Sequence, residues 1–155
     1  MISKSVGRVG EDAVHPPWKH DQTMKKCRIA LCRHEIPGSH PHLDLFLGPM
    51  EPRDEDELVA RSWRLMTDPR DLEETESLEV TPLPLHRAKY LCLEGPVRPR
   101  SQAGKVIPLC RGGCSVEEPD AETLRMTVRW QDGISGRFEI RMHRMQRLPT
   151  TDPDR

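Results

Sequence analysis

The segment Arg33–Leu47, RHEIPGSHPHLDLFL, decides the fold. Its second half carries three leucines on alternate positions, which predicts a β-strand over His42–Leu47 with the leucines in the core. Successive side chains of a strand point to opposite faces of the sheet, so His42 and Asp44 share the face opposite the leucines. The sequence therefore predicts a core strand that carries an imidazole and a carboxylate on its open side.

A second imidazole enters the same region from the preceding segment. The apolar run Cys27–Arg33 predicts a buried strand that ends beside His34, and Pro37-Gly38 predicts a turn after it. His34 can then lie next to His42 and Asp44. Two imidazoles and a carboxylate bind Mn, Fe or Zn and leave coordination positions open. Local hydrogen bonding in a histidine-rich turn explains the same residues equally well, and both interpretations stay open at this point.

The composition favours a small β-rich domain. Fifteen prolines among 155 residues argue against long helices and favour short strands joined by irregular connections. The net charge of −1 gives no global attraction for nucleic acid, and 4 % aromatic residues leave little material for base stacking. Five cysteines, without a signal peptide or a membrane-spanning stretch, lead us to expect a cytoplasmic protein without membrane contact.

Apolar runs and turn residues predict the order of the elements. We expect an irregular arm over 1–25, one domain over 26–148 and a flexible tail over 149–155. Residues 68–84 are predicted to be a long connection with at most one short helix, and residues 111–113 a turn. Further strands are predicted over Leu58–Met66, His86–Leu93, Lys105–Cys110 and both arms of a hairpin that turns at Asp132-Gly133. The fold class expected is mainly β: a small antiparallel β-barrel or strongly curved sheet with long loops and at most short helices.

A second polar cluster lies at 86–90. If this segment is a strand, His86 and Tyr90 share a face because they lie four residues apart. Together with Arg87 and Lys89 they could bind a phosphate, with His86 as proton donor or transition-state stabiliser. An edge strand with solvated basic residues is the alternative interpretation.

The remaining histidines and cysteines have simpler interpretations. His40 lacks the His-x-Asp spacing that makes His42 the better ligand, and His143 is expected at the surface. Cys110 and Cys114 do not form a structural zinc site with Cys27 and Cys32, because an odd separation places that second pair on opposite faces of a strand.

The motifs occur in the order His34, His42-x-Asp44, Ser62-Trp63 and His86-x-x-x-Tyr90-x-x-x-Glu94-Gly95. In this order they resemble the 3′-phosphoesterase domain of bacterial DNA ligase D, above all its small stand-alone versions. The similarity runs from about residue 27 to residue 144 and includes Gly136-Arg137-Phe138 in the closing hairpin.

The resemblance implies a small β-barrel enzyme that trims the 3′ ends of DNA in repair. Such an enzyme uses a divalent metal, manganese above all, to remove a 3′-terminal ribonucleoside and then the 3′ phosphate. Zinc or another transition metal is the alternative ion. His34, His42 and Asp44 are then the metal ligands, and His86 and Tyr90 lie at the scissile phosphate. The partners implied are primer-template 3′ ends and a DNA ligase or polymerase, and we expect a monomer.

Two alternatives remain beside this hydrolase. Phe46 and Gly48 stand where the family has an arginine and its carboxylate partner, which favours a non-catalytic metal- or nucleic-acid-binding module on the same barrel. An Fe(II) oxygenase could instead use His42-x-Asp44 with His86 or His143 as third ligand. The oxygenase ranks lower, because too little chain comes after His143 to complete such a fold.

Overall fold

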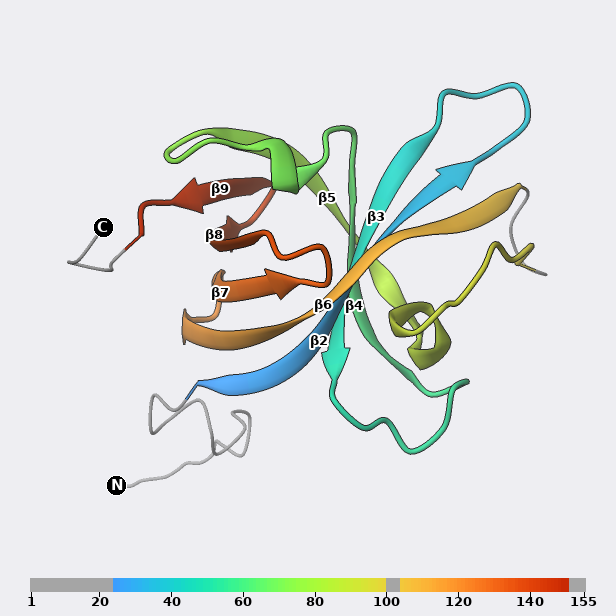
Figure 1. Ribbon diagram of the computed structural model, residues 1–155, viewed down its shortest axis with the longest axis horizontal. Helices are drawn as coiled ribbons and strands as arrows, with labels where there is room; N and C mark the ends of the chain where they lie inside the picture. The colour runs from blue at the N-terminus through green and yellow to red at the C-terminus, as the bar shows by residue number, and fades with distance from the viewer. Residues whose placement is uncertain (1–23, 100–103, 151–155) are drawn as a thin grey trace.

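The structure is a computed structural model that describes residues 24–99 and 104–150. Over these residues, one antiparallel sheet of eight strands closes in a ring, in the order β2-β3-β4-β5-β9-β8-β7-β6 (Figure 1). The strands and the two short 3-10 helices are β2 Lys25–Glu35, β3 His42–Pro49, β4 Leu58–Leu65, η1 Pro69–Asp71, β5 Ser77–Arg87, η2 Ala88–Leu91, β6 Lys105–Asp120, β7 Thr123–Trp130, β8 Ser135–Arg141 and β9 Arg144–Leu148. The predicted mainly β fold with short helices is confirmed.

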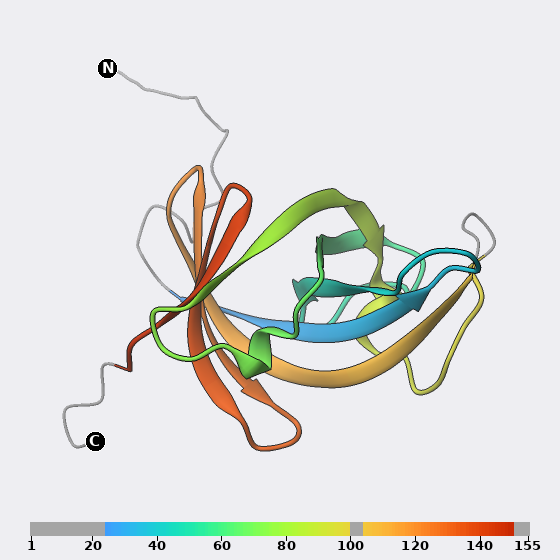
Figure 2. The same cartoon turned by 90° about the horizontal axis from the view of Figure 1, so that it is seen from above.

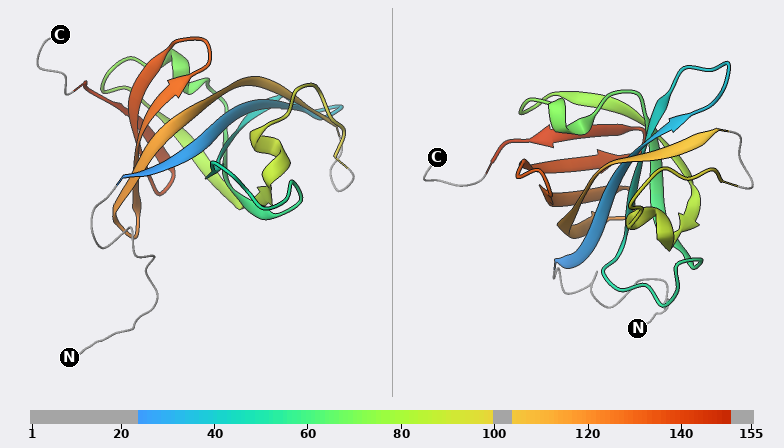
Figure 3. Two further views of the ribbon diagram at one scale, coloured as in Figure 1. Left: turned by 60° about the horizontal axis from the view of Figure 1, so that its bottom comes forward. Right: turned by 45° about the vertical axis from the view of Figure 1, so that its right-hand side comes forward.

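The strands β2 and β6 connect the two ends of the molecule. They run side by side along it, with β3 and β4 toward one end and the β7–β8–β9 meander at the other (Figures 2 and 3). β2 pairs with β3 on its second edge, so the segment 33–47 joins two neighbouring strands within the sheet.

The main core takes side chains from one face of all eight strands. Its largest fully buried members are Ile29, Leu31, Leu45, Leu65, Val80, Met126, Trp130, Phe138 and Met145. Leu43, Leu45 and Leu47 pack in or against this core, as the alternation predicts. The predicted hairpin is also present, with Gly133 at φ 93° in its turn.

A smaller cluster covers the opposite face of β2, β3 and β4. Tyr90 and Leu91 of η2 pack there against Phe46 of β3 and its neighbours. Gly48 permits this contact, because a Cβ at that position would lie 2.6 Å from Leu91 Cδ1. Cys32 belongs to this cluster and Cys27 to the main core, which confirms that these two cysteines occupy opposite faces.

The strand predicted over 86–93 is wrong. His86 and Arg87 end β5, and Ala88–Leu91 forms the 3-10 helix η2 instead. Ala88, Tyr90 and Leu91 are buried, and a helical turn brings these apolar side chains onto the sheet together.

The predicted connection over 68–84 is only partly right. It holds the short helix η1, but its second half is the strand β5, which contains Pro82 and Pro84. β5 pairs with β9 only at Ser77–Glu79, so the prolines lie where one edge of the strand has no ladder partner among the described residues. Proline is tolerated at such an edge because no amide hydrogen is needed there.

The turn predicted over 111–113 is also wrong, because β6 continues through both glycines to Asp120. The short strand β9 was not predicted. Pro149 and Thr150 carry no regular structure. Of the irregular arm expected over 1–25, residues 1–23 lie outside the described residues, and Lys25 already begins β2. In the part of the chain that the structure describes, no helix is both long and apolar enough to cross a membrane.

Candidate metal centre

The β2–β3 pairing brings the three predicted ligands together. His34 lies directly opposite His42, and Asp44 is the next residue of β3 on the same face. All three are buried, with exposed fractions of 2 % for His34, 7 % for His42 and 4 % for Asp44. The group could hold a metal ion, since the three side chains offer ligand atoms within 4.8 Å of one another.

The distances between the ligand atoms fit a small divalent ion. His34 Nδ1 lies 3.2 Å from His42 Nε2, and His42 Nε2 lies 3.4 Å from Asp44 Oδ1. His34 Nδ1 and Asp44 Oδ2 are 3.8 Å apart. Ligand atoms at about 2.1 Å from a tetrahedral ion are separated by roughly 3.4 Å, which is close to these spacings. Three protein ligands leave at least one coordination position for water or substrate.

The hydrogen-bond donors of the described residues do not satisfy the carboxylate of Asp44. Its Oδ1 is fully buried and accepts no hydrogen bond from the described residues, although His42 Nε2 is close. Burial raises the pKa of Asp44 from 3.8 to about 6, and the charges of His34 and Arg64 only partly offset this. A buried carboxylate oxygen without a donor is costly, and a cation would remove that cost.

The protonation states near neutral pH suit metal binding. Burial lowers the pKa of His42 from 6.5 to about 4, with further lowering by Arg64 and His34. At pH 7, His42 therefore has a free nitrogen lone pair and Asp44 carries its negative charge. Imidazole and carboxylate ligands must both be deprotonated to bind a metal.

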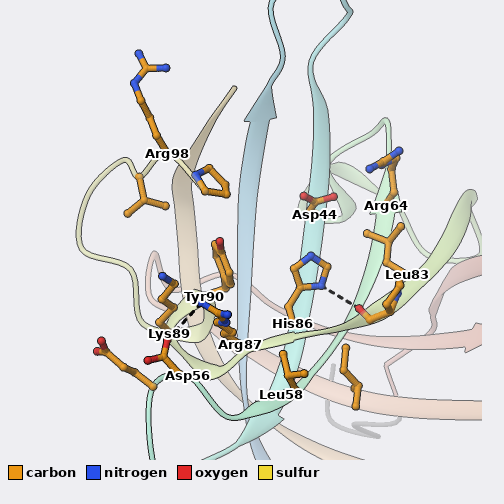
Figure 4. A pocket seen from close by; sticks show the side chains of 15 residues that line it. Asp44, Asp56, Leu58, Arg64, Leu83, His86, Arg87, Lys89, Tyr90 and Arg98 are labelled. Atoms are coloured by element: carbon orange, nitrogen blue, oxygen red, sulfur yellow. Dashed lines mark hydrogen bonds and ion pairs between the residues drawn. The ribbon is translucent and has the colours of Figure 1, made fainter. Parts of the chain in front are cut away.

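Asp44 also lines a pocket with a volume of about 850 Å³ (Figure 4). His86 and Tyr90 line the same pocket, so η2 brings them together although the strand predicted for them is absent. Besides Asp44, four basic side chains and two further acidic ones line its wall: Arg64, Arg87, Lys89, Arg98, Glu55 and Asp56.

His86 is held in one orientation by its hydrogen bonds. Its Nδ1 donates to the carbonyl oxygen of Pro84 at 2.9 Å, and Ser62 Oγ donates to the same carbonyl at 3.0 Å. The neutral ring then has its lone pair on Nε2, which points toward Asp44 in Figure 4. Burial lowers the pKa of His86, so the neutral form dominates near pH 7. His86 is therefore oriented to accept a proton at Nε2.

Phe46 of β3 packs beneath the residues of this pocket. Its ring stacks on Tyr90, with centroids 5.4 Å apart, and meets the edge of His86 at 5.2 Å. The side chain is 1 % exposed. Phe46 thus builds the apolar floor on which Tyr90 and His86 rest, and burial among them raises the pKa of Tyr90.

Arg64 is a residue of the candidate site that the sequence analysis did not predict. It lies opposite Asp44 in the β3–β4 register and lines the same pocket. Its positive charge lowers the pKa values of Asp44, His42 and His86, so it acts on the ligands and on His86 alike. Within 24–99 and 104–150 its side chain has no ion pair or hydrogen bond. The only signal in the sequence was the alternation after Ser62, which cannot give the register of β4 on β3.

Arg87 and Lys89, the two predicted phosphate-binding residues, also line the pocket, but unlike Arg64 each has a contact with a neighbouring side chain. Arg87 lies 3.7 Å from Asp56 in an exposed ion pair. Lys89 has its ammonium group 5.8 Å from the centre of the Tyr90 ring. We call His34, His42 and Asp44 the triad. His40 and His143 are exposed and lie outside it.

Comparisons with known proteins add no relative. No protein-family model, no curated protein and no solved structure matches this chain. The likeness to the ligase D phosphoesterases therefore stays a prediction from the motifs.

Proposed function

We propose that the protein is a divalent-metal-dependent phosphoesterase that removes a 3′-terminal phosphate or ribonucleoside from DNA. One observation carries this function: Asp44 of the buried triad, the oriented His86 and the basic side chains of Arg64, Arg87 and Lys89 line a single pocket. The resemblance of the motifs to the ligase D family supports the choice of substrate.

A divalent ion, Mn²⁺ for preference, held by His34, His42 and Asp44 would polarise a phosphoryl oxygen and favour attack by water. The chain itself supplies the other functions. Arg64 donates charge-assisted hydrogen bonds to the phosphate from the side of β4. His86 accepts a proton at Nε2 and returns it to the leaving oxygen, as a general base and then a general acid.

The test is an end-trimming assay on a primer-template that ends in a 3′ phosphate or in one ribonucleotide. With Mn²⁺ we expect release of the terminal group by the wild type and loss of release in His42→Ala and His86→Ala. His143→Ala is the matched control, because His143 is exposed and lies outside the triad.

Metal analysis of the same samples separates the remaining alternatives. Bound metal without release of the terminal group would support the non-catalytic binding module instead. Release that persists in His42→Ala would show that another site, or a contaminant, does the work. Absence of both metal and release would overturn the proposed function.

A further inference from the structure

A second basic surface lies on the outer face of β2, β6 and β7. The pairing registers set Arg28, Gly113 and Arg129 side by side in one row across these three strands. Arg111 precedes Gly113 by two residues, so it lies on the same face. The three arginines line a hollow of about 690 Å³ around the bare backbone of Gly113.

The next row continues this surface with a further two cations. It contains Lys26, Ser115, Thr127 and Arg137, on β2, β6, β7 and β8. Neither row contains a carboxylate, whereas the row beyond them alternates Glu117, Arg125 and Glu139. We call the five cations Lys26, Arg28, Arg111, Arg129 and Arg137 the basic face. A chain with net charge −1 thus gathers positive charge on one part of its sheet.

Within the described residues, no carboxylate pairs with these cations. Arg28 donates to the carbonyl oxygen of Met50 at 2.6 Å and to Cys92 Sγ at 3.0 Å, and both acceptors are neutral. Arg111 and Arg129 have no side-chain hydrogen bond or ion pair in the described part of the chain. Their charge is available to a bound anion.

The glycine pair shapes this surface. A Cβ on Gly112 would collide with the carbonyl oxygen of Arg129, so glycine is required there for β7 to lie close to β6. Gly113 has no heavy atom within 4 Å of an added Cβ, so its missing side chain leaves the hollow open. Glycine at 112 allows β7 to pack against β6, whereas glycine at 113 leaves the hollow between the arginines open.

The basic face is separate from the metal centre. Tyr90 lines the metal-site pocket and Leu91 lines the hollow, so η2 lies between the two. Arg28 and His34 are six residues apart on one face of β2, which corresponds to roughly 20 Å. One phosphate cannot touch both sites, but a duplex with about 3.4 Å per base pair would span that distance with roughly six base pairs.

We propose that the basic face binds the phosphate backbone of nucleic acid, without reading its sequence. A polymer with a charge on every nucleotide can occupy both rows at once, and Ser115 and Thr127 between the cations offer hydroxyl groups to phosphate oxygens. A flat anionic membrane fits less well, because the three arginines line a hollow rather than a projecting surface. Binding at this face is independent of the proposed hydrolysis.

The test measures binding of a fluorescent duplex of about 20 base pairs by the full chain at two salt concentrations. Each phosphate contact should cost about 3.5-fold in affinity between about 50 and about 200 mM salt. Five contacts, one for each cation of the basic face, give a loss of roughly 500-fold for the wild type, and the double variant Arg111→Gln/Arg129→Gln, with three contacts left, should lose only roughly 40-fold. Arg53→Gln, which removes one equally positive but 88 % exposed side chain, is the control.

A second pair of variants tests the hollow without removing any arginine. Gly113→Asp adds a negative charge and Gly113→Asn a neutral side chain of the same shape. We expect Gly113→Asp to weaken DNA binding at low salt far more than Gly113→Asn does. Equal binding by both, or a salt dependence unchanged in the arginine double variant, would overturn the proposal.

Two further measurements separate this surface from its alternatives. Arg111→Gln/Arg129→Gln should release the 3′-terminal group as the wild type does at low salt and saturating substrate, because neither arginine lines the metal-site pocket. Vesicles of anionic lipid are the competing probe. Arginine-dependent binding to vesicles, without binding to duplex, would assign the face to membranes and overturn the proposal for nucleic acid.

Discussion

The metal-free protein should become more stable when Asp44 is replaced by asparagine. Burial raises the pKa of Asp44 from 3.8 to about 6, and its Oδ1 has no hydrogen-bond donor among the described residues. Because the folded pKa exceeds the unfolded one, the folded state loses stability as the pH rises through about 6 and keeps it below 3.8. A difference of about 2 in pKa, at 1.36 kcal/mol each, gives roughly 3 kcal/mol as the upper limit.

Urea unfolding in the presence of a chelator measures this effect. At about pH 8, Asp44→Asn should exceed the wild type in free energy of unfolding by up to roughly 3 kcal/mol, and the two should converge near pH 4. His42, whose pKa is lowered to about 4, gives the opposite trend between pH 4 and 6.5. Because His42 is present in both proteins, its contribution to the free energy of unfolding cancels when the two are compared.

Metal reverses the order of the two proteins. At a metal concentration of about 1,000 times the dissociation constant, the wild type should gain roughly 4.1 kcal/mol, which exceeds its deficit of up to roughly 3 kcal/mol, and Asp44→Asn should gain much less. The exposed Asp71→Asn is the control and should change neither value. A wild type that is the more stable protein at pH 8 in chelator would refute the idea that Asp44 is strained without a cation.

Three other substitutions test the pocket and the packing that supports it. His86→Gln should lower kcat by about 10²–10⁴-fold while metal content stays unchanged, because only the proton transfer is lost. Arg64→Gln should lower kcat/KM by roughly 10- to 100-fold, as expected for one charge-assisted hydrogen bond to phosphate. Gly48→Ala should cost about 1–3 kcal/mol in urea unfolding, since its Cβ would meet Leu91 Cδ1, whereas Gly95→Ala has open space.

For each of these three substitutions, one outcome would contradict the role described for the residue. Loss of metal from His86→Gln would place His86 among the ligands rather than beside them. An unchanged kcat/KM in Arg64→Gln would remove the arginine from the substrate site. Equal stability of the Gly48 and Gly95 variants would mean that η2 does not pack on β3 as described.

The segment 33–47 shows how far sequence reasoning reaches. Alternation placed His42 and Asp44 on one face, and the turn at Pro37-Gly38 brought His34 beside them, because both signals are local. Register across strands is not local. The position of Arg64 opposite Asp44 depends on how β4 aligns with β3, so it could not be read from the chain.

Proline and glycine misled the prediction for a different reason. Pro82 and Pro84 suggested a loop, yet β5 tolerates them along an edge that β9 leaves unpaired beyond Glu79. Gly112-Gly113 suggested a turn, yet one glycine admits the backbone of β7 and the other leaves the outer face bare. The local meaning of both residue types is set by what packs against them.

The triad itself is best tested by counting metal ions. Wild-type protein loaded with Mn²⁺ or Zn²⁺ and then dialysed should retain one ion per chain by elemental analysis, and His42→Ala and Asp44→Asn should retain none. Equal metal content in wild type and variants, or none in any of them, would contradict a metal centre at His34, His42 and Asp44.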